Sequence, residues 1–162
     1  MGKNGLQLNI GSKFNPFIVA EISANHKKSI KRVFKMIDEA KIAKASAIKL
    51  QSYRPDTITL NIRNKNFFIS DKKSLWKNNY LYDLYKHGAT PWEWTNKIFK
   101  YAKQKKIICF STPFDRTSVD MLEKVNCPMY KIASFELTDH ILLEKVAKTK
   151  KPVILSTGMA TV

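Results

Sequence analysis

The feature that most constrains this chain is a regular alternation between short apolar segments and longer amphipathic ones. Five short segments are rich in β-branched and aromatic residues and predict strands: 17–23, 47–50, 107–111, 129–133 and 152–156. Four longer segments repeat apolar residues every three to four positions and predict helices: 29–44, 91–105, 116–125 and 138–148. Strands that alternate with helices in this order indicate an α/β fold with a parallel sheet of right-handed βαβ units.

Capping signals place the starts of three predicted helices. Ser29 can cap the first of them with its hydroxyl. Thr90 is expected to cap the second, with Pro91 at its first position. Thr138 or Asp139 is expected to cap the last.

A long stretch between the second strand and Pro91, residues 52–90, is predicted to be irregular. An aromatic group follows from its second half into the next helix: Trp76, Tyr80, Tyr82, Tyr85, Trp92 and Trp94. Such a group most often packs on itself as core or lid, and the functional alternative is a platform for a sugar.

Polar residues at the carboxyl end of every predicted strand favour one of two parallel architectures. An open doubly wound sheet gathers its ligand contacts at one switch point, usually beside a glycine-rich turn. This sequence has five glycines and no GxGxxG or GxxxxGK[ST] motif. A (β/α)8 barrel draws its chemistry from several strand ends and needs about 250 residues. With 162 residues, we expect a partial (β/α)8 TIM barrel of about five strands and four helices, with two strand edges unpaired.

The charge of the chain is strongly basic, and it restricts the classes of partner. Lys and Arg total 29 against 13 for Asp and Glu, which gives a formal net charge of +16. The arginines, which suit bidentate base and phosphate contacts, number only four: Arg32, Arg54, Arg63 and Arg116. Because the lysines are scattered, we expect a solvated surface that attracts small anions, and no nucleic-acid partner.

The remaining composition signals concern location and redox state. Residues 1–16 carry no apolar signal-peptide core, and the apolar runs are too short to span a bilayer, so we expect a cytoplasmic protein with no membrane partner. Cys109 and Cys127 form no CxxC pair and are expected to be buried, reduced thiols.

The polar residues at the predicted strand ends make a candidate anion site. If the sheet is a barrel wall, two lysines and several hydroxyls share one mouth with two carboxylates: Lys49, Lys131, Thr112, Ser134, Ser156, Glu21 and Glu136. Lysines among hydroxyls suit a compact dianion such as a phosphate, and the carboxylates could serve as acid, base or substrate anchor. Each residue alone would more often be an ion-pair partner, cap or turn, so the argument rests on their convergence.

Five motifs in order give the chain a family resemblance: FIVAEISANH at 17–26, AIKLQ at 47–51, FSTPFD at 110–115, YKIASFE at 130–136 and ILSTGM at 154–159. Together they resemble the sialic acid synthase family over nearly the whole chain. The stretch 59–94 is similar, more specifically, to the pseudaminic acid synthase branch of that family.

The resemblance implies a (β/α)8 barrel followed by a small antifreeze-like domain, in a homodimer. It implies a reaction in which a divalent metal, Mn or Mg, polarises a sugar aldehyde while phosphoenolpyruvate attacks it and releases phosphate. It also implies site residues. Lys49, Thr112, Lys131, Ser134 and Ser156 would bind phosphoenolpyruvate, Glu21 and Glu136 would be catalytic, and Gln51 and Asn25 would contact substrate more weakly.

The resemblance implies further that residues 1–162 are the N-terminal part of the synthase domain. The metal-binding histidines of the family would lie beyond Val162, with the C-terminal half-barrel and the antifreeze-like domain, so this chain holds no metal ligand and is expected to be inactive alone. His26 with His87 or His140 has no metal-ligand spacing.

Two alternatives remain at this point. One is another barrel lyase or aldolase that uses Lys131 as a Schiff-base amine. The other is a basic, non-catalytic binding module whose affinity would fall steeply with salt.

Overall fold

A computed structural model describes residues 6, 8, 10–158, 160 and 161, and its centre is one parallel sheet. The strands lie in space in the same order as in the chain, β1-β2-β3-β4-β5. Their bounds are Val19–Ser23, Ala47–Ser52, Ile108–Pro113, Tyr130–Ile132 and Val153–Leu155. This confirms the predicted α/β class and parallel sheet.

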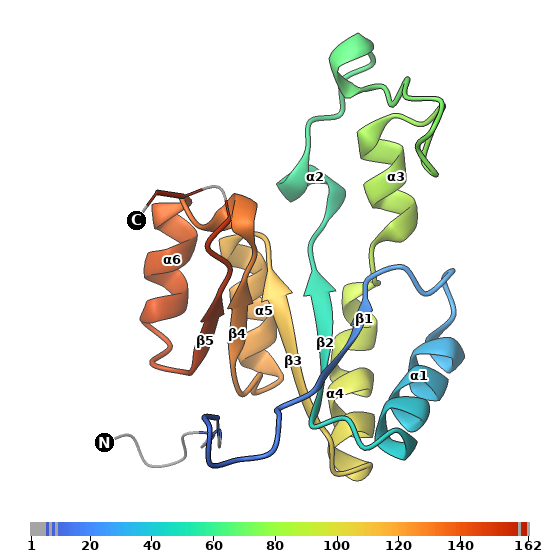
Figure 1. The fold of residues 1–162 in the computed structure, drawn as a ribbon. Helices are drawn as coiled ribbons and strands as arrows, with labels where there is room; N and C mark the ends of the chain where they lie inside the picture. The colour runs from blue at the N-terminus through green and yellow to red at the C-terminus, as the bar shows by residue number, and fades with distance from the viewer. Residues whose placement is uncertain (1–5, 7, 9, 159, 162) are drawn as a thin grey trace.

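Four helices cover one face of this sheet, as expected for part of a barrel wall (Figure 1). They are α1 (Ile30–Ile42), α4 (Thr95–Gln104), α5 (Arg116–Lys124) and α6 (His140–Ala147). Because the order of the five described strands never reverses, every crossover between them falls on the same side and they form no switch point. Among the described residues β1 and β5 each pair with one neighbour, so both edges are unpaired as predicted.

The core lies between the sheet and these helices. It is built from alternate strand residues, such as Ile48 and Ile132, packed against helix residues such as Ile37 and Leu122, all fully buried. The two cysteines are free and buried in this layer, as predicted, and burial raises the pKa of the Cys109 thiol.

Two of the capping predictions are confirmed and one is wrong. The Ser29 hydroxyl accepts a hydrogen bond from the Arg32 N–H, and the Asp139 carboxylate accepts one from the Leu142 N–H. Thr90 caps no helix, because Pro91 has ψ 129°, outside the helical range, and α4 begins at Thr95 after a 3₁₀ turn, Trp92–Trp94. The Thr90 hydroxyl instead donates to the Ala24 carbonyl over 2.8 Å.

The stretch predicted to be irregular contains two helices, so that prediction needs correction. Residues 53–90, named the excursion here, include α2 (Pro55–Ile58), a 3₁₀ turn (Lys65–Phe67) and α3 (Leu81–Gly88). The excursion projects beyond the carboxyl ends of the neighbouring strands (Figure 1). Its helices are not predicted from the sequence because α2 has only four residues and α3 only eight, too short for a sustained helical period.

Candidate functional site

Lys49 and Glu21 form the first half of the candidate site. Strand register places them side by side on β2 and β1, and their side chains make an ion pair. The Lys49 ammonium also donates to the Thr112 hydroxyl on β3 over 3.5 Å. The Lys49 side chain is only 15% exposed against 43% for Glu21, so the lysine lies deeper and the carboxylate faces solvent.

Lys131 and Glu136 form the second half, on β4 and on the 3₁₀ turn Ser134–Glu136 that follows it. Burial lowers the pKa of Lys131, and the positive charge of Lys49 lowers it further, while Glu136 and Glu21 oppose the shift. These mutual effects mean that all four groups share one electrostatic environment. We name Glu21, Lys49, Thr112, Lys131 and Glu136 the strand-end cluster.

Glu136 has the most unusual surroundings in the strand-end cluster. Burial raises the pKa of this carboxyl, and a backbone hydrogen bond and the charge of Lys131 compensate only partly. Its Oε2 is buried and has no hydrogen-bond partner among the residues that the structure describes. A buried carboxyl oxygen without a partner is costly, so Glu136 is suited to hold a proton or to bind a polar group of a ligand.

Ser134 and Ser156 lie on the neighbouring segments. Ser134 lies two residues before Glu136 on the same turn, and its hydroxyl lies so close to Gly158 that a Cβ there would meet the oxygen at 3.0 Å. The Ser156 N–H donates to the Ile132 carbonyl over 3.1 Å, which extends the β4–β5 pairing past Leu155. The structure therefore brings both serines to the end of the sheet that holds Lys131.

The two weaker candidates have different outcomes. Gln51 lies beside Thr112 in the β2–β3 register and is half-buried, so it borders the strand-end cluster. Asn25 is exposed, and its side-chain oxygen accepts a hydrogen bond from the Lys27 N–H over 3.1 Å. The contacts of Asn25 are those of a local turn.

The described residues by themselves do not fit a metal centre. No group of three His, Cys, Asp or Glu side chains comes together among them. His26 is buried, and its Nε2 lies 2.9 Å from the Ile22 carbonyl, so that nitrogen is engaged by the backbone of β1. Burial lowers the pKa of His26 although this hydrogen bond opposes the shift, which favours the neutral ring.

Four residues next to the site were not singled out from the sequence: Tyr53, Arg54, Phe114 and Asp115. Tyr53 directly follows β2, and its ring makes edge contacts with Phe114, after β3, and with Tyr85 of α3, both with centroids 5.7 Å apart. The strand-end rule could have found all four, because each lies within two residues of the end of β2 or β3.

The aromatic rings predicted to pack on one another have other partners. Tyr80 packs on Phe68, and Tyr85 packs on Tyr53. The Trp92 indole donates to the Tyr53 carbonyl over 3.2 Å. The rings therefore join the excursion to itself and to the end of β2.

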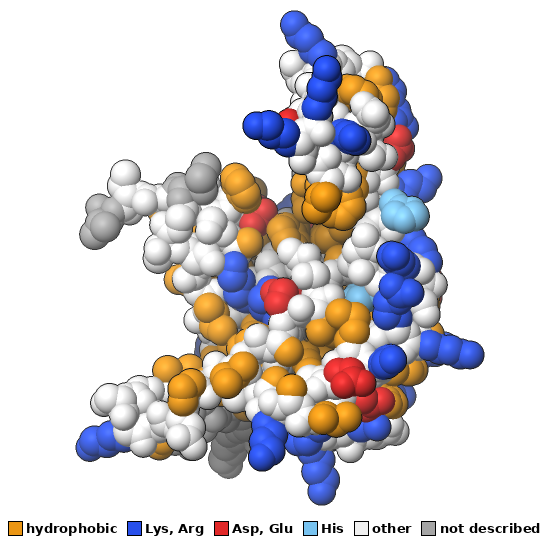
Figure 2. All heavy atoms as spheres, turned by 45° about the vertical axis from the view of Figure 1, so that its right-hand side comes forward, with side chains coloured by type: hydrophobic (Ala, Val, Ile, Leu, Met, Phe, Trp, Pro, Cys, Tyr) orange, Lys and Arg blue, Asp and Glu red, His pale blue; other side chains and the backbone are white. Residues whose placement is uncertain are grey.

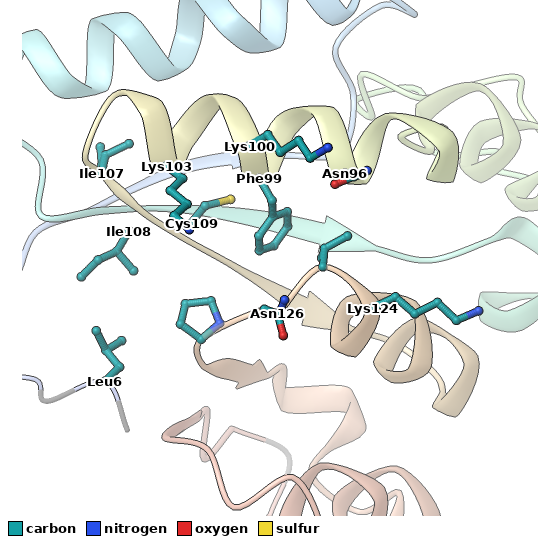
Figure 3. A pocket seen from close by; sticks show the side chains of 12 residues that line it. Leu6, Asn96, Phe99, Lys100, Lys103, Ile107, Ile108, Cys109, Lys124 and Asn126 are labelled. Carbon is teal, nitrogen blue, oxygen red and sulfur yellow. The ribbon is translucent and has the colours of Figure 1, made fainter. Parts of the chain in front are cut away.

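The surface at this end of the sheet is hollow. Figure 2 shows a hollow between the projecting excursion and the rest of the chain, with acidic and basic side chains meeting on its floor. A separate cavity of about 470 Å³ lies elsewhere, between α4, the start of β3 and the segment after α5 (Figure 3). None of the predicted site residues lines that cavity, whose lining includes Phe99 of α4 and, around the start of β3, Ile107 and Cys109.

Fold and site together define a class of protein: an α/β protein of the barrel type, with charged groups gathered at the carboxyl ends of its parallel strands. More particularly, the chain belongs to the NeuB family, whose sequence profile matches residues 36–162. None of the helices in the described part of the chain is long and apolar enough to cross a membrane.

Individual relatives agree with this family assignment. The chain is 47% identical over 145 residues to a pseudaminic acid synthase of Campylobacter jejuni and 44% identical over 146 residues to one of Helicobacter pylori. Each match covers 90% of this chain and 42% of the relative, so the chain spans less than half the length of these curated relatives. The crystal structure of an N-acetylneuraminic acid (sialic acid) synthetase from Leptospira borgpetersenii matches with a TM-score of 0.80 and 30% identity, covering 98% of this chain and 51% of that one.

Proposed function

We propose that this chain is the N-terminal part of a phosphoenolpyruvate-dependent nonulosonic acid synthase, a transferase that condenses phosphoenolpyruvate with an acetamido sugar and releases phosphate. The observation that carries the proposal is the strand-end cluster, where two lysines, a hydroxyl and two carboxylates converge. The product favoured is pseudaminic acid, because identity to the pseudaminic acid synthases is 44–47% against 30% to the sialic acid synthetase.

In this proposal the cationic side of the site holds phosphoenolpyruvate. Lys49 and Lys131 neutralise the phosphate and carboxylate, and three hydroxyls complete the site: Thr112, Ser134 and Ser156. The lysines are partly buried, so their charges are screened less than those of surface lysines. Gln51, beside Thr112, and Asn25 serve as weaker substrate contacts.

The two carboxylates act on the second substrate. The C3 carbon of phosphoenolpyruvate attacks the aldehyde carbon of the open-chain sugar, water adds at C2, and cleavage of the C2–O bond releases phosphate. Glu136 is suited to give or hold a proton at the aldehyde oxygen because burial raises the pKa of its carboxyl above the ordinary value. Glu21, exposed beside Lys49, is suited to orient the attacking water.

The rest of the proposal concerns the complete enzyme. Residues 1–162 contribute the first part of the barrel, and the C-terminal half-barrel and the antifreeze-like domain follow beyond Val162. The divalent metal, Mn or Mg, is held there by histidines. The enzyme acts in the cytoplasm as a homodimer, without nucleic-acid or membrane partners.

The anion site can be tested on the 162-residue chain without turnover. Phosphoenolpyruvate binding is measured by calorimetry for the chain and for Lys49→Met and Lys131→Met, which keep the apolar stem of lysine. Each loss of a charge-assisted contact is expected to weaken binding by about tenfold or more. Lys103→Met, on an exposed lysine at the opposite end of the sheet, removes the same charge and should change affinity less than twofold. Equal losses in all three variants would contradict a specific site.

Turnover is tested separately. Phosphate release is followed with phosphoenolpyruvate, manganese and a 2,4-diacetamido sugar, first with the 162-residue chain and then with the longer product if the reading frame continues. We expect turnover only from the longer product. Turnover by the short chain would overturn the assignment of essential residues beyond Val162.

A second candidate function is a Schiff-base lyase or aldolase, favoured by the lowered pKa of Lys131. A neutral amine at Lys131 would condense with a keto acid, and borohydride would trap the adduct. The synthase proposal predicts no trapped adduct with pyruvate. A stable mass increase at Lys131 would favour the lyase instead.

A further inference from the structure

The carboxylate of Asp115, directly after β3, makes more hydrogen bonds than a helix cap requires. Its Oδ1 accepts from the backbone N–H groups of Thr117 and Ser118 over 2.6 and 3.1 Å, which caps α5. Beyond the cap, Oδ1 also accepts from the Thr117 hydroxyl, and Oδ2 accepts from the Ser118 hydroxyl over 2.6 Å. Burial by itself raises the pKa of Asp115, but hydrogen bonds from Ser118, Thr117 and Thr57 outweigh it and lower the pKa.

These extra contacts reach the start of the excursion. The Thr117 hydroxyl donates to Asp115 and accepts from Arg54 Nη2 over 3.3 Å. The guanidinium of Arg54 also lies over the Trp92 ring, 4.8 Å from its centroid. Arg54, Thr117 and Asp115 therefore form a continuous polar connection, named the first clamp, between the start of the excursion and the β3–α5 loop.

The end of the excursion is held in a similar way against the loop after β1. The Lys28 ammonium donates to the carbonyls of Lys86 and Ala89 over 3.1 and 3.0 Å, at the carboxyl end of α3 where a cation is favourable. Between the two ends, Gly88 permits a close approach, because a Cβ there would meet the Tyr53 hydroxyl at 3.2 Å. Lys28 with its two carbonyl partners is named the second clamp.

The two clamps lie on either side of β2, the strand that carries Lys49. The phosphate-binding candidates extend from β2 toward β5, whereas the excursion projects at the β2 end of that row (Figure 1). A second substrate, bound next to the phosphate-binding candidates at their β2 end, would therefore lie beside the excursion.

We infer that Asp115 and Thr117 are positioning residues that hold the excursion as a fixed wall beside the site of the second, sugar substrate. The role of the wall rests on the proposed function, whereas the clamp itself is a property of this chain. A fixed wall keeps its geometry before the sugar binds, so less ordering entropy is lost on binding. Loosening the first clamp should therefore weaken sugar binding and leave phosphoenolpyruvate binding unchanged.

Thr117 offers a matched pair of variants for testing the clamp. Thr117→Val removes the hydroxyl that joins Arg54 to Asp115 but keeps the carboxylate cap of α5, and Thr117→Ser restores the hydroxyl. Amide hydrogen exchange is measured by NMR at Thr57 and Thr59, whose N–H groups donate to Arg54 and Pro55 carbonyls, and at the amides of α5. We expect about tenfold faster exchange in α2 for Thr117→Val, less than a twofold change in α5, and recovery in Thr117→Ser.

A second substitution separates capping from clamping. Asp115→Ser keeps a good N-cap residue but offers one oxygen in place of two. Amide exchange should therefore again speed up more in α2 than in α5. Thr149→Val removes a hydroxyl that donates to the Val146 carbonyl and accepts from the Lys151 N–H, and it serves as a control that should leave exchange in α2 unchanged. Unchanged α2 exchange in both clamp variants, or a loss spread equally over α2 and α5, would overturn the clamp.

The role of the excursion as a wall is tested by steady-state kinetics of the longer protein, the one expected to show turnover. Thr117→Val should raise KM for the sugar about tenfold with KM for phosphoenolpyruvate within twofold, and Thr117→Ser should restore the sugar KM. Equal rises in both KM values would overturn the positioning role. If the parent enzyme shows no turnover, the proposed function fails, and the exchange measurements still decide the clamp.

Discussion

The sheet with its four covering helices and the excursion are held together by different forces. In the sheet and helices, named the body here, fully buried apolar side chains such as Ile48 and Tyr130 pack in a continuous core. In the excursion, surface contacts dominate: Arg63 pairs with both oxygens of Asp83, and the Tyr82 hydroxyl donates to Asp56 over 2.8 Å. Buried area gives the body global stability, while exposed polar contacts give the excursion a defined position and little free energy.

The largest effect on the free energy of unfolding should come from a substitution that leaves a cavity in the core of the body. Ile48→Ala deletes buried methyl groups from the centre of β2, where the side chain is 0% exposed. We expect a loss of about 3 kcal/mol in the free energy of unfolding, measured by urea denaturation. Leu60→Ala, in the excursion, is the control, because that side chain is 59% exposed. Equal losses in the two variants would contradict a body-centred core.

A smaller change, a gain in the free energy of unfolding, should come from substitutions just after the body helices. Four residues just after these helices adopt positive φ values, and none of them is glycine: Lys44, Lys106, Asn126 and Lys150. A non-glycine residue there costs about 1 kcal/mol, so Lys106→Gly should raise the unfolding free energy by a similar amount. Lys103→Gly, inside α4, should lower it instead. A loss in Lys106→Gly would show that its backbone is not strained.

The strand-end cluster lies at the end of the body from which the excursion projects. The pH dependence of its affinity for phosphoenolpyruvate tests the ionisation of Glu136. The raised pKa means that Glu136 is neutral at low pH and gains a negative charge as pH rises through that pKa. That charge repels phosphoenolpyruvate, so affinity of the parent chain should fall over this pH range by about three- to tenfold. Glu136→Gln should lack this step. Since the ligand titrates in both proteins, the ratio of their affinities isolates Glu136, and a ratio independent of pH would contradict the assignment.

The smallest effect should come from the exposed ion pair of the excursion. Arg63 lowers the pKa of Asp83 through a hydrogen bond, so the stabilisation is present above the ordinary Asp pKa of 3.8 and is lost as pH falls through the lowered value. Arg63→Ala should speed amide exchange near Phe68 and Tyr80 and leave the urea midpoint unchanged. High salt should mimic the substitution. A shift of the global midpoint would place the excursion within the cooperative unit of the body.

The same contrast explains how much could be predicted. The strands and helices of the body follow from periodicity, because each buries one face. Lys49, Lys131 and Glu136 could be selected as a group because carboxyl ends of parallel strands meet at one edge. The helices α2 and α3 are too short for a sustained helical period. The hydrogen bond from Thr90 to Ala24 and the turn around Asn25 are single contacts, which leave no period in the sequence.

By itself the sequence determined the class of fold, the order of its elements, the edge at which charge collects and the family resemblance. These follow from local patterning and from the handedness of βαβ units. Only the tertiary structure decided that Lys49 pairs with Glu21, that a Glu136 oxygen is buried without a described partner, and that Thr117 and Lys28 make hydrogen bonds with the two ends of the excursion. The physical reason is that pairing and desolvation depend on distances of a few ångströms between residues far apart in the chain, and these distances exist only once the core has formed.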